Sequence, residues 1–196
     1  MKPSVQQEAW IINSPELEQL RRDVQYLKDR ADIADCIAQH ARGCDRHDVD
    51  LLASAYAEDG LDEHGVTRNR GREYPTWANA VHAASSSAHL HNITTHRCDI
   101  DGDQAHAESY VLVTLLSADG TTATVMCGRY IDRLERRDGA WRIVVRRSTV
   151  ELAFTADASL LHSRFFTAQH YLRGTRDTND LSYARPLDVN MEATRW

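Results

Sequence analysis

The sequence predicts an α+β fold with helices first and an antiparallel sheet after them. Three observations support this. Apolar residues recur at helical spacing in the first quarter of the chain, the pattern changes to period two after residue 88, and three Asp-Gly pairs separate the later alternating runs. Helical and strand segments that do not alternate indicate an α+β layout rather than a parallel βαβ layout. The length of 196 residues suits one domain with a substantial core.

The first helix is predicted to begin at Ser14–Glu18. Serine is a good N-cap, proline is tolerated in the first turn, and acidic side chains favour the positive end of the helix dipole. A narrow apolar stripe follows at spacings of three and four, which predicts that this helix packs against another surface. The stripe consists of Leu17, Leu20, Val24 and Leu27.

Two further helices are predicted before residue 61. One carries Ile33, Cys36, Ile37 and His40, and it ends at residues 43–45. A short helix over about Val49–Ala57 comes next, and Glu58-Asp59-Gly60 is expected to end it.

The rest of the chain predicts a meander of strands. Residues 61–75 suit short strands and turns, Thr76–Ala84 suits a helix, and Leu160–Tyr171 suits another. Asp-Gly pairs are strong hairpin signals between alternating apolar runs. The expected long strands cover residues 89–100, 104–117, 121–136 and 140–152.

Composition excludes several classes of protein. A formal net charge of −6 argues against nucleic-acid binding through bulk electrostatics. Membrane insertion is not expected, because no run approaches the roughly 18 apolar residues of a membrane span. The N-terminus lacks a secretory signal, so a cytoplasmic protein is expected, in which Cys36, Cys44, Cys98 and Cys127 are packed, reduced thiols.

The high count of ten histidines requires an explanation, because histidine both titrates near neutral pH and binds metals. In the strand over 89–100, period two places His89, His91, Ile93 and Thr95 on one face and His96 on the other. The His89-x-His91 pair could chelate zinc, but the spacing nominates no third ligand, so no metal site is predicted.

Two charged residues suit a different kind of chemistry. Asp45 follows a helix end, where the dipole disfavours an acid, so it is either a solvated loop acid or a carboxylate that orients a histidine. Arg146 is either a surface residue beside Arg147 or an inward guanidinium that could hold an oxygen or an anionic leaving group.

These pieces together resemble a SnoaL-like member of the nuclear transport factor 2-like superfamily, over about residues 30–152. Within that superfamily the pattern resembles scytalone dehydratase, bile-acid dehydratase and hexachlorocyclohexane dehydrochlorinase. The segments that carry the resemblance are Gly43–Asp48 with Leu52–Asp59, His91–Thr95 with Asp99–Ala105, and Gly128–Asp132 with Arg137–Ile143 and Arg146-Arg147.

The resemblance implies a cone-shaped barrel, in which a curved antiparallel sheet and the N-terminal helices enclose a pocket. It also implies site roles. Asp45 and His91 take the positions of the catalytic aspartate and histidine, and Arg146 that of the pocket arginine. His40 and His64 stand where dehydratases of the family can carry tyrosines, a departure that argues against a close copy of either dehydratase reaction.

The function expected from the resemblance is a cofactor-independent lyase. His91 would remove a proton from carbon, Asp45 would orient the imidazole, Arg146 would stabilise the leaving group or an enolate, and His64 or His40 could supply a proton. The substrate would be small and hydrophobic, and an aromatic or polycyclic compound would suit such a site. The side chains expected to line its pocket, unless they are plain core, are Tyr56, Trp77, Tyr110, Tyr130 and Phe154.

Alternatives stay open, because a fold does not determine a function. The same site could catalyse an isomerisation, the protein could be a ligand-binding or assembly module, or it could resemble the small subunit of a ring-hydroxylating dioxygenase. The expected organisation is an N-terminal extension over 1–14, a domain over 15–152, and a C-terminal segment over 153–196 that packs on the domain or on a neighbouring subunit. The resemblance also implies a homo-oligomer, a dimer or a trimer, because this fold commonly forms oligomers where the outer sheet face is exposed. The stripe of the first helix and the C-terminal segment could cover neighbouring subunits.

Overall fold

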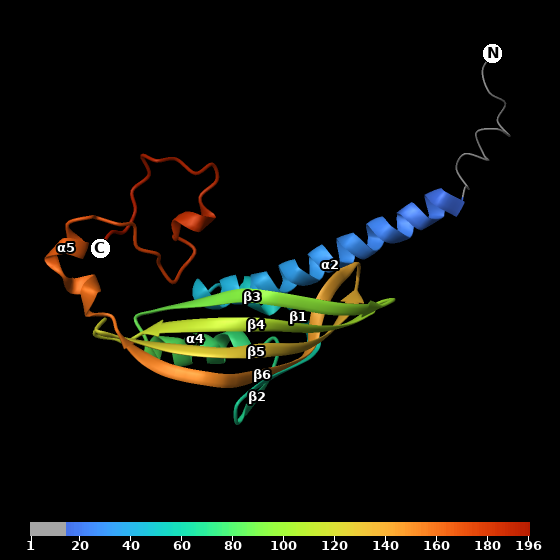
Figure 1. The fold of residues 1–196 in the computed structure, drawn as a ribbon, viewed down its shortest axis with the longest axis horizontal. Coiled ribbons are helices and arrows are strands. Elements are labelled where there is room, and N and C mark those ends of the chain that lie inside the picture. Colours follow the sequence, from blue (N-terminus) through green and yellow to red (C-terminus); the bar gives the residue numbers. More distant parts are fainter. Residues whose placement is uncertain (1–14) are drawn as a thin grey trace, which may run out of the picture.

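A computed structural model of the chain describes residues 15–196, so the predicted extension over 1–14 lies outside the described residues. The first element is one long helix, α2 (Pro15–Asp45), in place of the two that the sequence predicts. Its second half packs against the sheet, and its first half extends past the end of the sheet (Figure 1). The residues of its second half that are most buried are Ile33, Cys36, Ile37, His40 and Cys44.

Three residues of the apolar stripe at the start of α2 are not covered by any part of the chain that the structure describes. Leu20, Val24 and Leu27 are all more than half exposed. The expectation that the stripe packs against another surface is therefore not met by any described part of the chain.

Two elements near residue 55 differ from the prediction. Helix α3 covers only Val49–Ser54, with Asp48 as N-cap, and strand β1 begins at Tyr56 and runs to His64. Glu58-Asp59-Gly60 therefore lies inside a strand instead of ending a helix. Long-range pairing of β1 with the last strand overrides the local turn propensity of these three residues.

The remaining elements follow the predicted order. They are β2 (Thr67–Arg70), α4 (Tyr74–Ser85), β3 (Ala88–Asp101), β4 (Gln104–Leu116), β5 (Thr122–Arg137) and β6 (Ala140–Asp157). The three predicted Asp-Gly turns are confirmed, and their glycines adopt positive φ angles of 58° to 76°. Strand β6 extends five residues past the predicted end at 152 because it keeps pairing with β5 as far as Asp157.

The six strands form one sheet in the order β2-β1-β6-β5-β4-β3. All neighbouring pairs are antiparallel except β1 and β6, which are parallel. The α+β prediction is confirmed. Helices α2, α3 and α4 lie on one side of the curved sheet, and the core lies between them (Figure 1).

The C-terminal segment contains little regular structure. The helix predicted over 160–171 is replaced by two single turns, η1 (Ser159–His162) and α5 (Arg164–Thr167), and a third short turn follows at η2 (Leu181–Tyr183). The segment folds back beside the C-terminal end of α2 (Figure 1). Within the part of the chain that the structure describes, no helix is both long and apolar enough to cross a membrane.

Candidate active site

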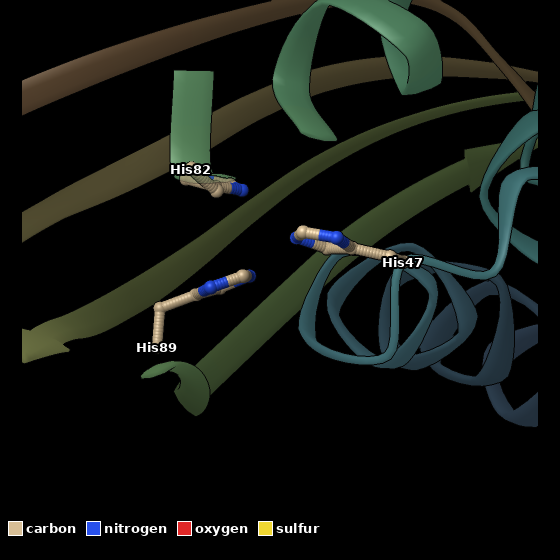
Figure 2. Close-up of side chains that lie close together, drawn as sticks. All are labelled: His47, His82 and His89. Atoms are coloured by element: carbon tan, nitrogen blue, oxygen red, sulfur yellow. The ribbon is translucent and has the colours of Figure 1, made fainter. Parts of the chain in front are cut away.

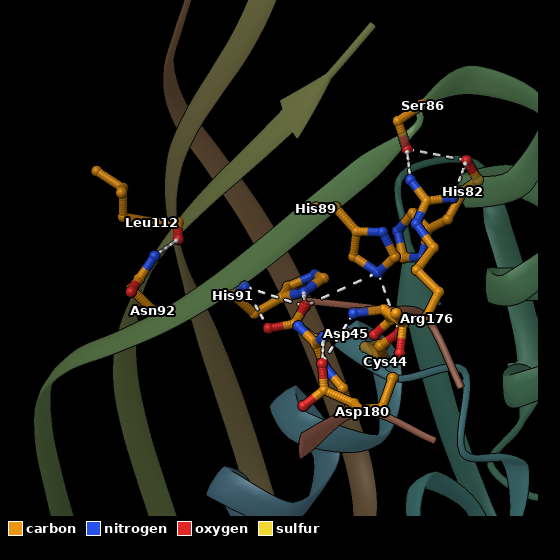
Figure 3. Close-up of polar contacts among 12 residues, drawn as sticks. Cys44, Asp45, His82, Ser86, His89, His91, Asn92, Leu112, Arg176 and Asp180 are labelled. Atoms are coloured by element: carbon orange, nitrogen blue, oxygen red, sulfur yellow. Dashed lines mark hydrogen bonds and ion pairs between the residues drawn. The ribbon is translucent and has the colours of Figure 1, made fainter. Parts of the chain in front are cut away.

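Asp45 is the last residue of α2, and its buried carboxylate faces strand β3. Its Oδ1 lies 2.7 Å from Nδ1 of His91, and its two oxygens accept the backbone N–H of His91 at 3.1 and 3.0 Å (Figure 3). One carboxylate therefore fixes both the backbone and the ring of His91. The predicted pairing of Asp45 with His91 is present in the geometry.

This pairing determines which nitrogen of His91 is available for chemistry. A carboxylate accepts a hydrogen bond from Nδ1–H, so the neutral ring carries its lone pair on Nε2. No described residue is hydrogen-bonded to Nε2. The arrangement is that of an oriented general base whose cation the carboxylate would stabilise.

A groove of about 610 Å³ opens beside this pair. Its apolar lining comes from α2 and β3, and its polar lining comes from α2 and the turn after it, from β3 and from the C-terminal segment. The lining residues are Ala38, Ala41, Arg42, Asp45, Arg46, His91, Asn92, Ile93, Gly174, Asp180 and Ser182.

Arg46 holds the C-terminal segment against the site. The Arg46 Nη1 donates to the carbonyl of Thr175 at 2.5 Å and to Oδ2 of Asp180 at 2.9 Å. The Asp180 carboxylate also accepts from the backbone N–H of Thr175 at 2.8 Å. Nothing local in the sequence indicated Asp180 or the residues around it, because their contribution depends on contacts more than 125 residues apart.

His40 lies in the interior among three tyrosines, one turn before Asp45 on α2. Its ring is completely buried and stacks on the Tyr74 ring, with 5.5 Å between the ring centres. The rings of Tyr56 and Tyr130 lie nearly perpendicular to it, with their centres 5.6 and 5.5 Å away. Neither ring nitrogen has a hydrogen-bond partner among the described residues. Burial, and next the nearby positive charge of Arg146, lower the pKa of His40 well below its usual range.

A second imidazole–carboxylate pair lies on β1. His64 Nδ1 is 2.9 Å from Oδ1 of Asp62 and 3.2 Å from Oγ of Ser148, and the hydroxyl of Tyr56 donates to the other Asp62 oxygen at 2.5 Å. Asp62 is completely buried, whereas the His64 side chain is about one-third exposed. The strands predicted over 61–75 already place Asp62 and His64 on one face by period two, but Asp62 was not among the predicted site residues.

Arg146 occupies the interior and not the groove. Its Nε and Nη2 donate to the two carboxylate oxygens of Asp132 at 2.8 and 2.6 Å, and its guanidinium carbon lies 4.0 Å from the centre of the Tyr130 ring. Both partners are completely covered, and Nη1 has no hydrogen-bond partner among the described residues. The predicted pocket arginine is thus a buried, paired arginine.

The predicted aromatic lining divides in two. Trp77 lies at the interior cluster, 6.1 Å from His64 and 5.6 Å from Tyr74. Tyr110 and Phe154 are each about half exposed, and Tyr110 stacks under Arg129 on the outer side of the sheet. Those two therefore do not line a pocket with the others, since alternation along their strands turns them outward.

Strand β3 brings further histidines to the site. His89, His91 and Ile93 share the face predicted for them, but a bulge between Ile93 and His96 changes the alternation, so Thr95 leaves that face and His96 joins it beside Ser109. His89 donates from Nε2 to the carbonyl of Cys44 at 3.0 Å. Two sets of side chains could hold a metal, His47 with His82 and His89, and Asp45 with His89 and His91.

Burial gives these histidines unusual acidity. It lowers the pKa of His82 and of His89 to about 3, with further contributions from the repulsion of His91 on His82 and of His82 on His89. Burial, and next the charge of Arg176, lower the pKa of His47. These rings are therefore neutral at pH 7.

Comparison with known proteins agrees with the sequence resemblance. Residues 25–147 match the family described as the SnoaL-like domain. No curated protein matches the sequence. Among solved structures, an aspartate-to-asparagine variant of Rv3472, a Mycobacterium tuberculosis protein described as of unknown function, shares 31% identity with a TM-score of 0.59, covering 66% of this chain and 75% of that one.

Two structures with named activities share the fold. A hexachlorocyclohexane dehydrochlorinase, LinA-type3 of Novosphingobium barchaimii LL02, has a TM-score of 0.63 at 23% identity, covering 68% of this chain and 94% of that one. A candidate scytalone dehydratase of Novosphingobium aromaticivorans DSM 12444 has a TM-score of 0.60 at 19% identity, covering 69% and 91%. The observed sheet and helices are those of the nuclear transport factor 2-like cone.

Proposed function

Because this chain belongs to the SnoaL-like family, we propose that it is a lyase that eliminates a leaving group from a small, largely apolar substrate without a cofactor. The observation that carries the proposal is the Asp45–His91 pair at the edge of an open groove. Fold neighbours that include a dehydrochlorinase support lyase-type or isomerase-like chemistry in general.

In the proposed reaction His91 Nε2 takes a proton from a carbon next to an activating group. The electron pair of that C–H bond forms the new double bond, and the leaving group departs with its own bonding pair. Asp45 holds the imidazole by Nδ1 and stabilises the cation that forms. A halide leaving group needs no proton. A hydroxide leaving group needs one, and protonated His64, whose Nδ1 Asp62 holds, would supply it to a substrate that reaches from the groove to the interior cluster of His64, Tyr74 and Trp77.

Arg146 contributes to this site indirectly. Two of its nitrogens are bound to Asp132, so its charge is largely compensated inside the molecule. We assign it a positioning role: it supports the Tyr130 ring, against which His40 packs.

The test is turnover of a panel of small substrates that carry an acidic C–H beside a hydroxyl or a halide, including hexachlorocyclohexane. Halide release and the absorbance of a new conjugated double bond report elimination. Exchange of Asp45→Asn and His91→Gln should each lower kcat by about 10²–10⁴ while the protein stays folded. A product of unchanged mass would identify isomerisation by the same pair.

Matched controls are available on the exposed surface. Asp101→Asn and His106→Gln change the same residue types at exposed positions and should leave kcat unchanged. Full turnover in both Asp45→Asn and His91→Gln would refute the proposed roles.

We also propose a homo-oligomer in which a second copy covers the exposed stripe of α2. Leu20, Val24 and Leu27 form an apolar row on a helix that projects beyond its own sheet. Light scattering after size exclusion should give more than one chain per particle, and Leu20→Glu with Leu27→Glu should give monomers. A monomeric wild-type protein would contradict this.

A further inference from the structure

Three histidines outside the Asp45–His91 pair converge on one point. His47 lies in the turn after α2, His82 near the end of α4, and His89 at the start of β3 (Figure 2). One ring nitrogen of each lies within 4.8 Å of one ring nitrogen of the other two. We propose that these three imidazoles form a binding site for a divalent late first-row transition metal of the zinc class.

The hydrogen bonding of the cluster supports a ligand site. His47 Nε2, His82 Nδ1 and His89 Nδ1 are all buried and have no hydrogen-bond partner among the described residues. A buried polar atom without a partner is costly, and native proteins usually satisfy it with a protein group, a water or an ion. Three such atoms on neighbouring rings indicate that one ligand satisfies them together.

His89 shows how the site fixes a ring for metal binding. Its Nε2 donates to the Cys44 carbonyl at 3.0 Å, so the lone pair of the neutral ring is on Nδ1, the nitrogen without a partner. A backbone carbonyl that holds the second nitrogen is the usual outer partner of a metal-bound histidine.

The donor set determines the class of ion. Three imidazoles suit zinc, cobalt, nickel or copper, whereas calcium and magnesium prefer oxygen donors. Tetrahedral zinc has Zn–N bonds of about 2.0–2.1 Å, which sets the ring nitrogens roughly 3.4 Å apart. The rings of His82 and His89 now lie 4.0 Å apart between centroids, with their planes 33° apart, so metal binding requires these rings to turn until their lone pairs meet. A fourth position would remain for water, as in zinc sites with three protein ligands.

Charged groups of both signs lie beside the cluster. The Asp45 carboxylate is 3.8 Å from His89 Nε2, and the Arg176 guanidinium binds the His82 carbonyl and the Ser86 hydroxyl at 3.3 and 2.8 Å (Figure 3). Arg46 also acts on His47, but it is paired with Asp180, so the Asp45 carboxylate offsets chiefly the charge of Arg176. The metal would join three segments that meet at the mouth of the proposed active site, independently of the elimination reaction.

The experiment uses the untagged full chain, stripped with EDTA and titrated with Co²⁺ and with Zn²⁺. We expect one ion per chain, visible d–d absorption with Co²⁺, and a rise in Tm. His47→Gln and His82→Gln should each weaken the affinity at least tenfold, and His106→Gln on the exposed surface of β4 should not change it.

Asp45→Asn separates this site from the alternative set of Asp45, His89 and His91. If Asp45→Asn abolishes binding and His47→Gln does not, the three-histidine site is refuted. Absence of Co²⁺ and Zn²⁺ binding by the wild-type chain also refutes it, and that measurement does not depend on whether any variant folds.

Discussion

Among the ion pairs of the described residues, that of Arg146 and Asp132 is the one in which neither side chain is exposed at all. Both side chains are completely covered, and two hydrogen bonds join them. Breaking a buried ion pair by removing one partner leaves an uncompensated charge, whereas replacing both partners with apolar residues removes the desolvation cost of both charges.

This contrast gives a prediction for Arg146. Arg146→Met should lower the free energy of unfolding by about 3–5 kcal/mol, because Asp132 stays buried without its partner. Arg146→Met combined with Asp132→Leu should recover most of that loss. Urea unfolding of the two single variants and the double variant measures this, and a double variant no more stable than Arg146→Met would show that the loss comes from something other than the unpaired carboxylate.

Residue-level reasoning anticipated some of the site and missed other parts for identifiable reasons. Local patterns place Asp45 at a helix end and His91 on a strand face, but the expectation that the two side chains pair came from the family resemblance. Asp132 was not singled out as the partner of Arg146, which is 14 residues away on the neighbouring strand. His47 and His82 were assigned no partners, because the contacts of His47 with His82 and His89 join segments 35 and 42 residues apart. The spacing of His89 and His91 could not supply a third metal ligand that comes from other elements.

At the scale of elements, the C-terminal segment completes the groove although it contains only short helical turns. Arg46 at the end of α2 holds it through Thr175 and Asp180, and the hydroxyl of Tyr183 donates to Asp48 at 2.7 Å. Few apolar side chains of the segment are buried, so these polar contacts determine how long it stays in place.

Asp180→Asn should therefore loosen the segment without unfolding the domain. The change removes the charge that pairs with Arg46, a contact in which both side chains are mostly covered. Hydrogen exchange should become at least several-fold faster over residues 173–184 and stay unchanged in β4 and β5, with little change in Tm. Glu192→Gln, which removes an exposed charge in the same segment, is the control, and equal protection in Asp180→Asn would contradict the anchoring role of Arg46.

Elements were predictable where local patterns and long-range pairing agree. The three Asp-Gly hairpins, the strands they join and α4 fall within a few residues of their predicted positions. The errors at residues 55–60 have a different origin, since the parallel pairing of β1 with β6 depends on a partner about 80 residues away. The α2 stripe is exposed because the first half of the helix extends beyond the end of the sheet.

At the scale of the whole molecule, the interior is unusually rich in neutral histidine. His40 faces Tyr56, Tyr74 and Tyr130, and the positive charge of Arg146 lies close to it. A histidine whose folded-state pKa is lowered is neutral in the native protein at a pH where the unfolded chain already binds a proton. Such a group does not change the free energy of unfolding at a pH above its unfolded-state pKa of about 6.5. As the pH falls below that value, it lowers the free energy of unfolding.

The stability of this protein should therefore fall steeply between pH 6.5 and 5, before most carboxylates titrate. Each strongly shifted histidine adds about 1.4 kcal/mol per pH unit to the slope, and His40 is the one least connected to other polar groups. His40→Phe should remove about that much of the slope, as measured by urea unfolding at several pH values with EDTA present, so that no metal holds His82 or His89 unprotonated. The surface change His106→Phe should leave the slope as it is. An unaltered slope in His40→Phe would mean that His40 becomes protonated in the native state, which its burial among three tyrosines and beside Arg146 argues against.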